Sequence, residues 1–409
     1  MFPWKQQSRP IGLDMGADGV RMVQLEVVGD TPVVTAAARE TWPGDVLGQI
    51  DKARAPLPRE ARQLLERLLR QGGFAGREIA IALPREIVNV KSVRLPQMPA
   101  EDIESAARLE AHQAFDIKED DYQVRAIPVG EVRQGGEARQ EVLLLAVKNT
   151  DIDELVEQWH AIGFTPISID FEPASIYRTV ERFVRRKDDE AEVNVLVDIG
   201  HRWTNVVIGR GRELNFFKPI DIGGRKLCEA VARSLGVTPD EARTLRGRLV
   251  ETADTAAAIG NDSVRQAVHD TLRPSVEQIG REIALCLRYY SVNFRGRRPL
   301  RVRVIGGEAR DPLVIRILSQ VLPVPVEAAR LIANADMSRM KAADRVVGLG
   351  EWTVAFGLAL KSLRGGFADR LGPSRAMQAD EVLALQADGT AAELRPAAPN
   401  ASPEEVVNA

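Results

Sequence analysis

The sequence predicts a two-lobed α/β fold. Two short Asp-x-Gly turns, Asp14-Met15-Gly16 and Asp198-Ile199-Gly200, each end an apolar strand and lead into a second strand. A tight turn of this kind leaves backbone N–H groups pointing outward, and its glycine removes the side chain that would block an approaching phosphate. The chain has 409 residues, which is too long for one ordinary hydrophobic core. The repeated turn therefore indicates two lobes that close on one nucleotide.

The composition argues against several other classes of protein. The hydrophobic content of 44% is enough to fill two cores, and the net charge of −3 gives no electrostatic reason to expect nucleic acid. Cys228 and Cys286 lie in helical apolar patterns, so we expect core residues in a reducing compartment. The four histidines show no metal-ligand spacing. No secretory signal and no apolar run of ~20 residues is present, so we expect a soluble cytoplasmic protein.

Apolar periodicity predicts both strands and helices in the first half of the chain. The leucine stripe at 58–71 is typical of an amphipathic helix, and Gly72-Gly73 can end it. Acidic residues gather after Pro99, where they suit the positive end of a helix dipole. The predicted strands lie within 10–37 and at 79–83, 121–130, 140–147 and 166–170, and the predicted helices are 58–71, 101–115, 150–163 and 173–186.

The second half begins again with strand, turn and strand, and then becomes largely helical. Thr238 and Glu241 form a capping box at one helix start, and Pro274 should kink or divide the long helical region. Residues 373–409 lack sustained periodicity, so we expect a disordered tail. The predicted strands are 193–197, 205–208, 213–220 and 302–305, and the predicted helices are 224–234, one that begins after 238, 262–294, one that ends at 321, and 348–363.

The first turn offers a carboxylate and a cation to a nucleotide. Arg21 lies across the predicted hairpin from Asp14, and its guanidinium can reach a β- or γ-phosphate. Asp14 can hold Mg²⁺ directly or through water. Gly16, Ala17 and Asp18 would present the turn to the phosphates. The alternative is an ordinary hairpin in which Asp and Gly serve turn chemistry alone.

The second turn is similar but bulkier. Thr204 can bond a phosphate through its hydroxyl and its N–H, while Asp198 can bind the metal or orient an attacking water. Gly200 and Asn205 flank these groups. The alternative is again a plain hairpin, with Trp203 as a packed aromatic side chain. The two turns in matching contexts are more specific than either one.

Two glycine pairs precede predicted helices. Gly306-Gly307 follows a strand and is suited to letting an adenine or ribose lie against the backbone. Gly223-Gly224 carries the same interpretation, although glycines are common at such turns. Glu241 can accept a hydrogen bond from a ribose hydroxyl, but its place three residues after Thr238 favours a capping role.

Taken in order, four motifs resemble the phosphate 1, phosphate 2 and adenosine elements of the actin-like ATPase superfamily: Ile11-Gly12-Leu13-Asp14-Met15-Gly16, Val197-Asp198-Ile199-Gly200, Ile222-Gly223-Gly224 and Ile305-Gly306-Gly307. Within that superfamily the chain resembles the PilM family of type IV pilus assembly proteins, a relative of the cell-division protein FtsA. The similarity covers residues 9–366, and its closest stretches are 95–115, 142–147, 163–164, 169–170, 221–227, 236–237, 241–242 and 356–360.

This resemblance implies an actin-like (ribonuclease-H-like) α/β fold with two lobes and an inserted 1C-type subdomain. The first lobe would span 9–186, with the insertion at about 84–170. The second lobe would span 192–345 and have a 2A/2B-like arrangement. A helix at 346–366 would return to the first lobe.

The resemblance also implies a cytoplasmic scaffold that binds ATP and Mg²⁺ and docks the cytoplasmic N-terminal segment of a PilN-like inner-membrane protein beside the insertion. The protein would be peripheral at the inner membrane through this partner, without inserting into the membrane itself, and its copies would form a ring. The residues assigned to the nucleotide and its metal are Asp14, Gly16, Ala17, Asp18, Arg21, Asp198, Gly200, Arg202, Thr204, Asn205, Gly223, Gly224, Glu241, Gly306, Gly307 and Glu308.

The chain departs from the family pattern at two places. His201, Arg202 and Trp203 replace the small residues usual in the second phosphate loop, and Glu308 stands where a small residue is common. Arg202 can offset the crowding electrostatically. We therefore expect ATP binding with weak or absent hydrolysis, and Asp198 is the candidate catalytic residue.

Two alternatives stay open at this point. A sugar or metabolite kinase on the same superfold would need a base beside its acceptor hydroxyl, and the sequence offers no dedicated base beyond Asp198. A division tether like FtsA would need a C-terminal amphipathic membrane helix, whereas residues 402–409 are acidic and short. The sequence does not separate a pilus from a related secretion machine.

Overall fold

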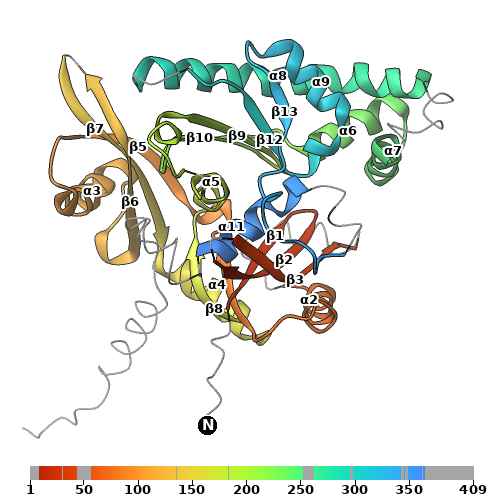
Figure 1. Cartoon of the computed structure of the whole chain (residues 1–409), viewed down its shortest axis with the longest axis horizontal. Coiled ribbons are helices and arrows are strands. Elements are labelled where there is room, and N and C mark those ends of the chain that lie inside the picture. Colours follow the sequence, from red (N-terminus) through yellow and green to blue (C-terminus); the bar gives the residue numbers. More distant parts are fainter. Residues whose placement is uncertain are drawn as a thin grey trace, which may run out of the picture.

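A computed structural model describes residues 9–29, 31–43, 57–134, 136–182, 184–251, 262–294, 298–341, 345, 349–361 and 363. Its strands form two five-stranded sheets and one three-stranded sheet, which surround two central helices (Figure 1). The α/β class predicted from the sequence is confirmed. The tail predicted at 373–409 lies outside the described residues.

The first sheet is built around the first Asp-x-Gly turn. It has the order β3-β2-β1-β4-β8, in which β1, β2 and β3 are antiparallel neighbours and β4 and β8 run parallel to β1. Val20 and Met22 of β2 are fully buried, so apolar side chains fix this hairpin in the core. The strands are β1 (Ile11–Gly16), β2 (Gly19–Val28), β3 (Thr31–Thr41), β4 (Glu78–Ala82) and β8 (Thr165–Asp170).

The second sheet repeats this plan around the second turn. Its order is β11-β10-β9-β12-β13, where β9, β10 and β11 are antiparallel neighbours and β12 and β13 run parallel to β9. Each Asp-x-Gly strand therefore lies at the centre of its sheet, between a hairpin partner and a parallel strand. The strands are β9 (Val193–Ile199), β10 (Thr204–Arg210), β11 (Glu213–Ile220), β12 (Val302–Ile305) and β13 (Val326–Ala328).

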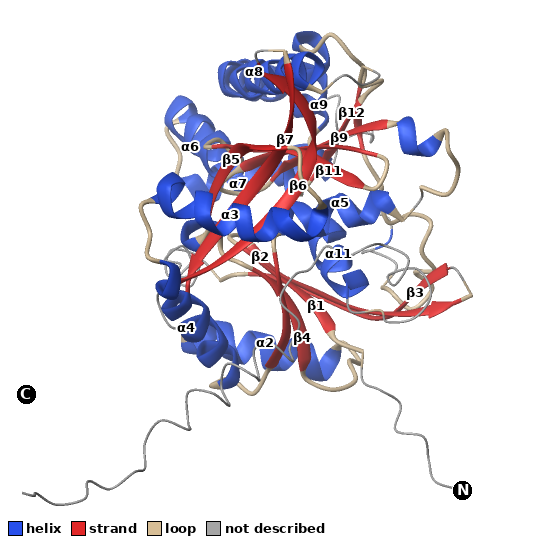
Figure 2. Ribbon diagram, turned by 90° about the vertical axis from the view of Figure 1, so that its left-hand side faces the viewer, coloured by secondary structure: helices blue, strands red, loops and turns tan. Residues whose placement is uncertain are grey.

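In chain order, the strands of the three-stranded sheet come between β4 and β8, which are neighbours in the first sheet. The three-stranded sheet comprises β5 (Asn89–Pro96), β7 (Glu137–Lys148) and β6 (Tyr122–Gln134), in that spatial order. Helix α3 (Ala100–Phe115) packs on these strands through its own small core, and α4 (Asn149–His160) follows β7 (Figure 2). Strand β6 also contacts β11 of the second sheet, where the Asn215 amide donates to the Val129 carbonyl at 2.5 Å.

Two helices lie between the five-stranded sheets (Figures 1 and 2). Helix α5 (Glu172–Glu181) contacts the second sheet, and α11 (Thr353–Lys361) contacts the first sheet and α5. A Cβ at Gly12 of β1 would collide with the backbone of α11, and one at Gly357 of α11 would collide with the backbone of Ser175. Glycine at these two positions is what allows the sheet and the helices to pack this closely.

The remaining helices cover the outer faces of the five-stranded sheets. Pro274 lies inside one continuous helix, α8, so the expected division of this region is not observed. Cys228 and Cys286 are buried and free, as predicted. The helices are α2 (Arg59–Gln71) on the side of the first sheet, and α6 (Gly224–Leu235), α8 (Asp262–Asn293) and α9 (Pro312–Val321) on the side of the second, with α7 (Pro239–Glu251) packed against α6. Within the described residues, no helix has the length and apolar character needed to cross a bilayer.

Candidate functional site

The first turn places a cation directly opposite a carboxylate. In the β1–β2 register Asp14 pairs with Arg21, and Gly16 pairs with Gly19 at the end of the ladder. The predicted position of Arg21 across the hairpin is confirmed. Its Nη1 lies 3.9 Å from Asp14 Oδ2, and its Nη2 donates to Asp18 at 3.3 Å. The side chain of Arg21 is only 10% exposed, so this cation belongs to an interior site.

Three half-buried carboxyls from different elements interact electrostatically near this turn. Burial raises the pKa of Asp14 to about 7 and the pKa of Asp198 to about 6, and Arg21 opposes both shifts. Burial and repulsion from Asp198 and Asp14 raise the pKa of Glu172 to about 8. The Asn205 amide donates to Glu172 at 2.7 Å. Buried carboxyls that repel one another favour either protons or a cation between them.

Glu351 ties the first turn to the second sheet. It lies in the short 3-10 turn η6 (Leu349–Trp352), where its side chain is 6% exposed. Its carboxylate accepts from Arg21, Arg39 and Arg310, each at 3.1 Å. Arg21 and Arg39 belong to the first sheet, whereas Arg310 ends the 3-10 turn η5 (Gly307–Arg310) after β12. The buried Glu351 carboxylate thus connects Arg21 of the first turn to η5, the turn that follows β12 in the second sheet.

The second turn directs its cation elsewhere. The Arg202 guanidinium pairs with Glu86 of the 3-10 turn η1 (Arg85–Ile87) at 2.5 Å and lies over the Trp203 ring, 5.1 Å from its centroid. The Thr204 hydroxyl donates to the Ile222 carbonyl at 2.7 Å, and Thr204 is fully buried. Arg202 therefore bridges the second turn to the first half of the chain, while Thr204 fastens β10 to the start of α6.

The two glycine pairs form close backbone contacts around the second turn. The Gly224 N–H donates to Gly200 at 2.9 Å, and a Cβ at Gly223 would lie 2.7 Å from the carbonyl oxygens of Gly200 and His201. Ile305 pairs with Asp198 in the sheet, so Gly306 follows beside that carboxylate. Gly306 has a φ of 85°, a conformation that favours glycine.

Glu308 and Glu241 have different environments. The Glu308 carboxylate lies against Gly224 and forms an ion pair with Arg246 of α7. Glu241 is fully exposed, accepts from the Thr238 N–H at 2.8 Å and receives the Thr238 hydroxyl at 2.9 Å. The predicted capping role of Glu241 is therefore confirmed. Its contacts give no support to the ribose alternative.

The carboxyl cluster fits a magnesium ion that is shared with phosphate. Among the residues that the structure describes, no group of three or more His, Cys, Asp or Glu side chains is arranged to hold a metal by itself. Mg²⁺ is usually held by one or two carboxylates, with waters and substrate phosphates completing its shell. Asp14 and Asp198 supply two such carboxylates with raised pKa values. The donor set therefore suits Mg²⁺ that arrives with a polyphosphate.

Sequence reasoning missed four residues that shape this region. They are Glu86, Glu172, Arg246 and Glu351, and each comes from an element distant in sequence from both turns. A local signal existed only for Glu172, because it is an acidic residue at the start of a helix that directly follows the parallel strand β8. The others are identified only by their tertiary contacts.

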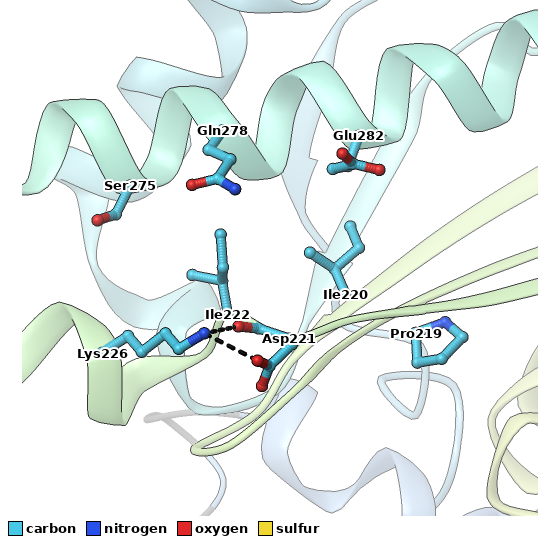
Figure 3. Close-up of a pocket in the computed structure, with 8 residues that line it drawn as sticks. All are labelled: Pro219, Ile220, Asp221, Ile222, Lys226, Ser275, Gln278 and Glu282. Atoms are coloured by element: carbon cyan, nitrogen blue, oxygen red, sulfur yellow. Dashed lines mark hydrogen bonds and ion pairs between the residues drawn. The ribbon is translucent and has the colours of Figure 1, made fainter.

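A separate pocket lies between the β11–α6 connection and the middle of α8 (Figure 3). It has a volume of about 340 Å³ and includes Lys226, which is bonded to Asp221. Neither Asp-x-Gly turn contributes to it. The residues that line the pocket are Pro219, Ile220, Asp221, Ile222, Lys226, Ser275, Gln278 and Glu282.

Comparison with known proteins identifies the class and the family. A solved structure described as the PilM-PilN type IV pilus biogenesis complex has 21% sequence identity and a TM-score of 0.70, covering 87% of this chain and 99% of that chain. Ethanolamine utilization protein EutJ from Carboxydothermus hydrogenoformans has 14% identity and a TM-score of 0.49, covering 88% and 92%. An archaeal actin homolog has 13% identity and a TM-score of 0.42, covering 87% and 99%.

The TM-score of 0.70 shows that this chain shares the fold of the PilM-PilN structure, as the resemblance to the PilM family implied. The sequence model of the family described as type IV pilus assembly protein PilM matches residues 12–363. The chain belongs to this family.

Proposed function

We propose that this chain is a magnesium-nucleotide-binding scaffold of a type IV pilus assembly machine, and that it docks the cytoplasmic N-terminal segment of a PilN-like inner-membrane protein. Bound nucleotide would hold the two halves of the fold together and bias the surface that receives the partner. The protein would then act by a shift between conformations, because a ligand stabilises the state it binds more tightly. Its place would be the cytoplasmic side of the inner membrane, through the partner.

The observation that carries the nucleotide part is the convergence of Asp14, Glu172 and Asp198. These carboxyls come from β1, α5 and β9, and burial raises the pKa of each, while repulsion from Asp198 adds to the shift of Asp14 and repulsion from both adds to that of Glu172. A divalent cation would relieve that repulsion, and Arg21 would complement the phosphates. Asp14 and Asp198 would hold Mg²⁺, directly or through water. When bound, Mg²⁺ would neutralise phosphate charge, while Glu172 would lie beside it at the start of α5.

Family membership and the inserted sheet support the partner part. The structure with a TM-score of 0.70 is described as a complex of PilM with PilN. In this chain β5 forms one edge of the three-stranded sheet, and most of its residues are exposed or half-buried. An extended peptide can add to such an edge through main-chain hydrogen bonds. We therefore assign the docking of the partner segment to the side of this sheet that β5 borders.

The nucleotide part is tested by calorimetric titration of the full chain with Mg-ATP. Wild type should release heat, and Asp14→Asn should weaken binding by about 10–100-fold, the usual cost of disturbing a metal shell. Asp270→Asn is the matched control, because Asp270 is 58% exposed and lies on the outer helix α8. If neither the wild type nor the control protein gives a binding signal, nucleotide has no part in the function.

The partner part is tested with a fluorescent peptide that carries the cytoplasmic N-terminal segment of the PilN-like protein of the same machine. Its anisotropy should rise on adding this chain, and Mg-ATP should change the affinity. Asp14→Asn should bind the peptide but lose the response to Mg-ATP, whereas Asp270→Asn should keep it. Equal affinities with and without Mg-ATP would separate docking from nucleotide and remove the population shift from the proposal.

A further inference from the structure

The glycine turns before α6 and after β12 meet around a single carboxylate. A Cβ at Gly224 would collide with Glu308 Oε1 and would lie 3.1 Å from its Cδ. Gly306 is bounded on its other side by the Asp198 carboxylate and the Ile199 carbonyl. The Glu308 carboxylate therefore lies in the space between the two glycine turns. In open α/β sheets, ligands bind beyond the carboxyl ends of the parallel strands, and β9 and β12 end at this place.

Arg246 holds Glu308 there. Both terminal nitrogens of Arg246 donate to the Glu308 carboxylate, and Nη2 also donates to Asp311 at 2.9 Å. The side chains of Arg246, Glu308 and Asp311 are 7%, 16% and 7% exposed. Arg246 lies on α7, whereas Glu308 and Asp311 lie before α9. The ion pair therefore connects α7 to the 3-10 turn η5, which borders the proposed nucleotide site.

The Glu308–Arg246 ion pair affects the phosphates of a nucleoside triphosphate differently from its ribose and base. The phosphates and their metal would approach Asp14 and Asp198, and the Asp198 carboxylate lies against Gly306. A ribose and base that lie against the backbone of Gly224 must first move Glu308 away, because both cannot occupy the same place. Moving it separates the Glu308 carboxylate from the Arg246 guanidinium, which costs free energy. Binding of the phosphates alone does not break this pair and does not carry that cost.

We propose that Glu308, held by Arg246, is a specificity-determining residue that opposes binding of the nucleoside part of a nucleoside triphosphate. This proposal rests on the nucleotide function proposed above and adds a barrier to the same site. The chain then binds the polyphosphate group without opposition and gains little from the nucleoside. A variant that lacks the Glu308 carboxylate admits the nucleoside without breaking an ion pair.

The remaining partners of Arg246 favour folding of a variant without the Glu308 carboxylate. Asp311 remains bonded to Arg246 when Glu308 is removed, so the guanidinium keeps a buried partner. Asp311 also accepts from the Leu313 N–H at 3.0 Å and caps α9, which holds it in place. Glu308→Ala should therefore fold, and its thermal unfolding can be compared with that of wild type. Glu327→Ala is a matched control, because Glu327 is an exposed glutamate of β13, outside the glycine turns.

The test is calorimetric titration of the full chain with two probes, Mg-ATP and magnesium tripolyphosphate. Glu308→Ala should bind Mg-ATP at least tenfold more tightly than wild type and bind tripolyphosphate within twofold of wild type. Glu308→Gln should lie between them, and Glu327→Ala should match wild type with both probes. A wild type that binds Mg-ATP no more tightly than tripolyphosphate, beside a variant that binds Mg-ATP more tightly, would support the barrier most directly.

Other outcomes overturn the proposal in distinguishable ways. Equal or weaker binding of Mg-ATP by folded Glu308→Ala, beside clear binding by wild type, removes the barrier and leaves the nucleotide function standing. Failure of every protein to bind either probe overturns the nucleotide function and the barrier together. An equal gain for both probes would mean that Glu308 acts only as a negative charge near the phosphates, which also contradicts the proposal.

Discussion

The two Asp-x-Gly turns share a topology but differ in what surrounds their cations. In the first turn, Arg21 lies inside the protein among Asp14, Asp18 and Glu351. In the second turn, Arg202 reaches across to Glu86, where the two side chains are 20% and 31% exposed. The two turns therefore share a backbone arrangement, but their arginines have different roles. The first cation is held in an interior group of carboxylates, and the second connects the halves of the fold.

This difference changes the interpretation of the crowded second turn. The sequence suggested that Arg202 offsets the crowding electrostatically and belongs to the nucleotide site, whereas in the structure it pairs with Glu86 and lies over the Trp203 ring. Thr204 and Asn205 likewise bond to Ile222 and Glu172. The side chains of the second turn thus already have protein partners. Their proposed contacts with phosphate would need these bonds to be shared or exchanged.

The largest expected effect comes from the support of the first cation. Glu351→Ala removes a buried carboxylate that accepts from three arginines, so we expect a loss of about 3–5 kcal/mol in the free energy of unfolding. Glu86→Ala removes the partly exposed partner of Arg202 and should cost at most about 1 kcal/mol. Denaturant unfolding of both variants measures the contrast. Similar losses would mean that the two cations are supported equally.

The next effect concerns the strand before each turn. A Cβ at Gly12 would collide with the backbone of α11, while the equivalent position before the second turn is the buried Leu196. Gly12→Ala should therefore destabilise the protein by about 1–3 kcal/mol or more, the usual cost of overpacking. Gly247→Ala is the control, because Gly247 lies in α7 with open space around it, and the change should be neutral or stabilising. Chemical denaturation again provides the measurement.

A third prediction compares the cations directly with a ligand. Arg21→Ala should weaken Mg-ATP binding by about tenfold, because a charge-assisted bond to phosphate contributes roughly 1.5–3 kcal/mol. Arg202→Ala should change the affinity by less than about threefold, since its partner is Glu86. Calorimetric titration of both variants decides between them. A larger loss in Arg202→Ala than in Arg21→Ala would restore the place in the nucleotide site that the sequence suggested for Arg202.

The turns were predictable because their signals are local. Hairpin register alone places Arg21 opposite Asp14, and strand alternation with glycine turns defines the two sheets. Family resemblance supplied the actin-like arrangement, which local patterns alone do not specify. The partners of the cations were not predictable, because Glu86 and Glu351 meet Arg202 and Arg21 only after distant elements pack together.

The smallest expected effect concerns Glu181, a carboxyl outside the turns. Its titration adds to the pH dependence of stability that the turn carboxyls produce. Glu181 ends α5, and burial raises its pKa to about 7, although Arg178 and Arg212 oppose the shift. Because the folded state holds this proton more tightly than the unfolded state, its contribution to stability is present below about pH 4.5 and is lost as pH rises through about 7.

Glu181→Gln should therefore reduce the decline in melting temperature between pH 5 and pH 8, by an amount equivalent to less than about 1 kcal/mol after solvent screening. The melting temperatures should be measured with a metal chelator present. The decline that remains would then come mainly from the other buried carboxyls, including Asp14 and Asp198, whose pKa values lie in the same range. An unchanged decline in Glu181→Gln would mean that Glu181 is already ionised in the folded protein, and that the turn carboxyls account for the pH dependence without it.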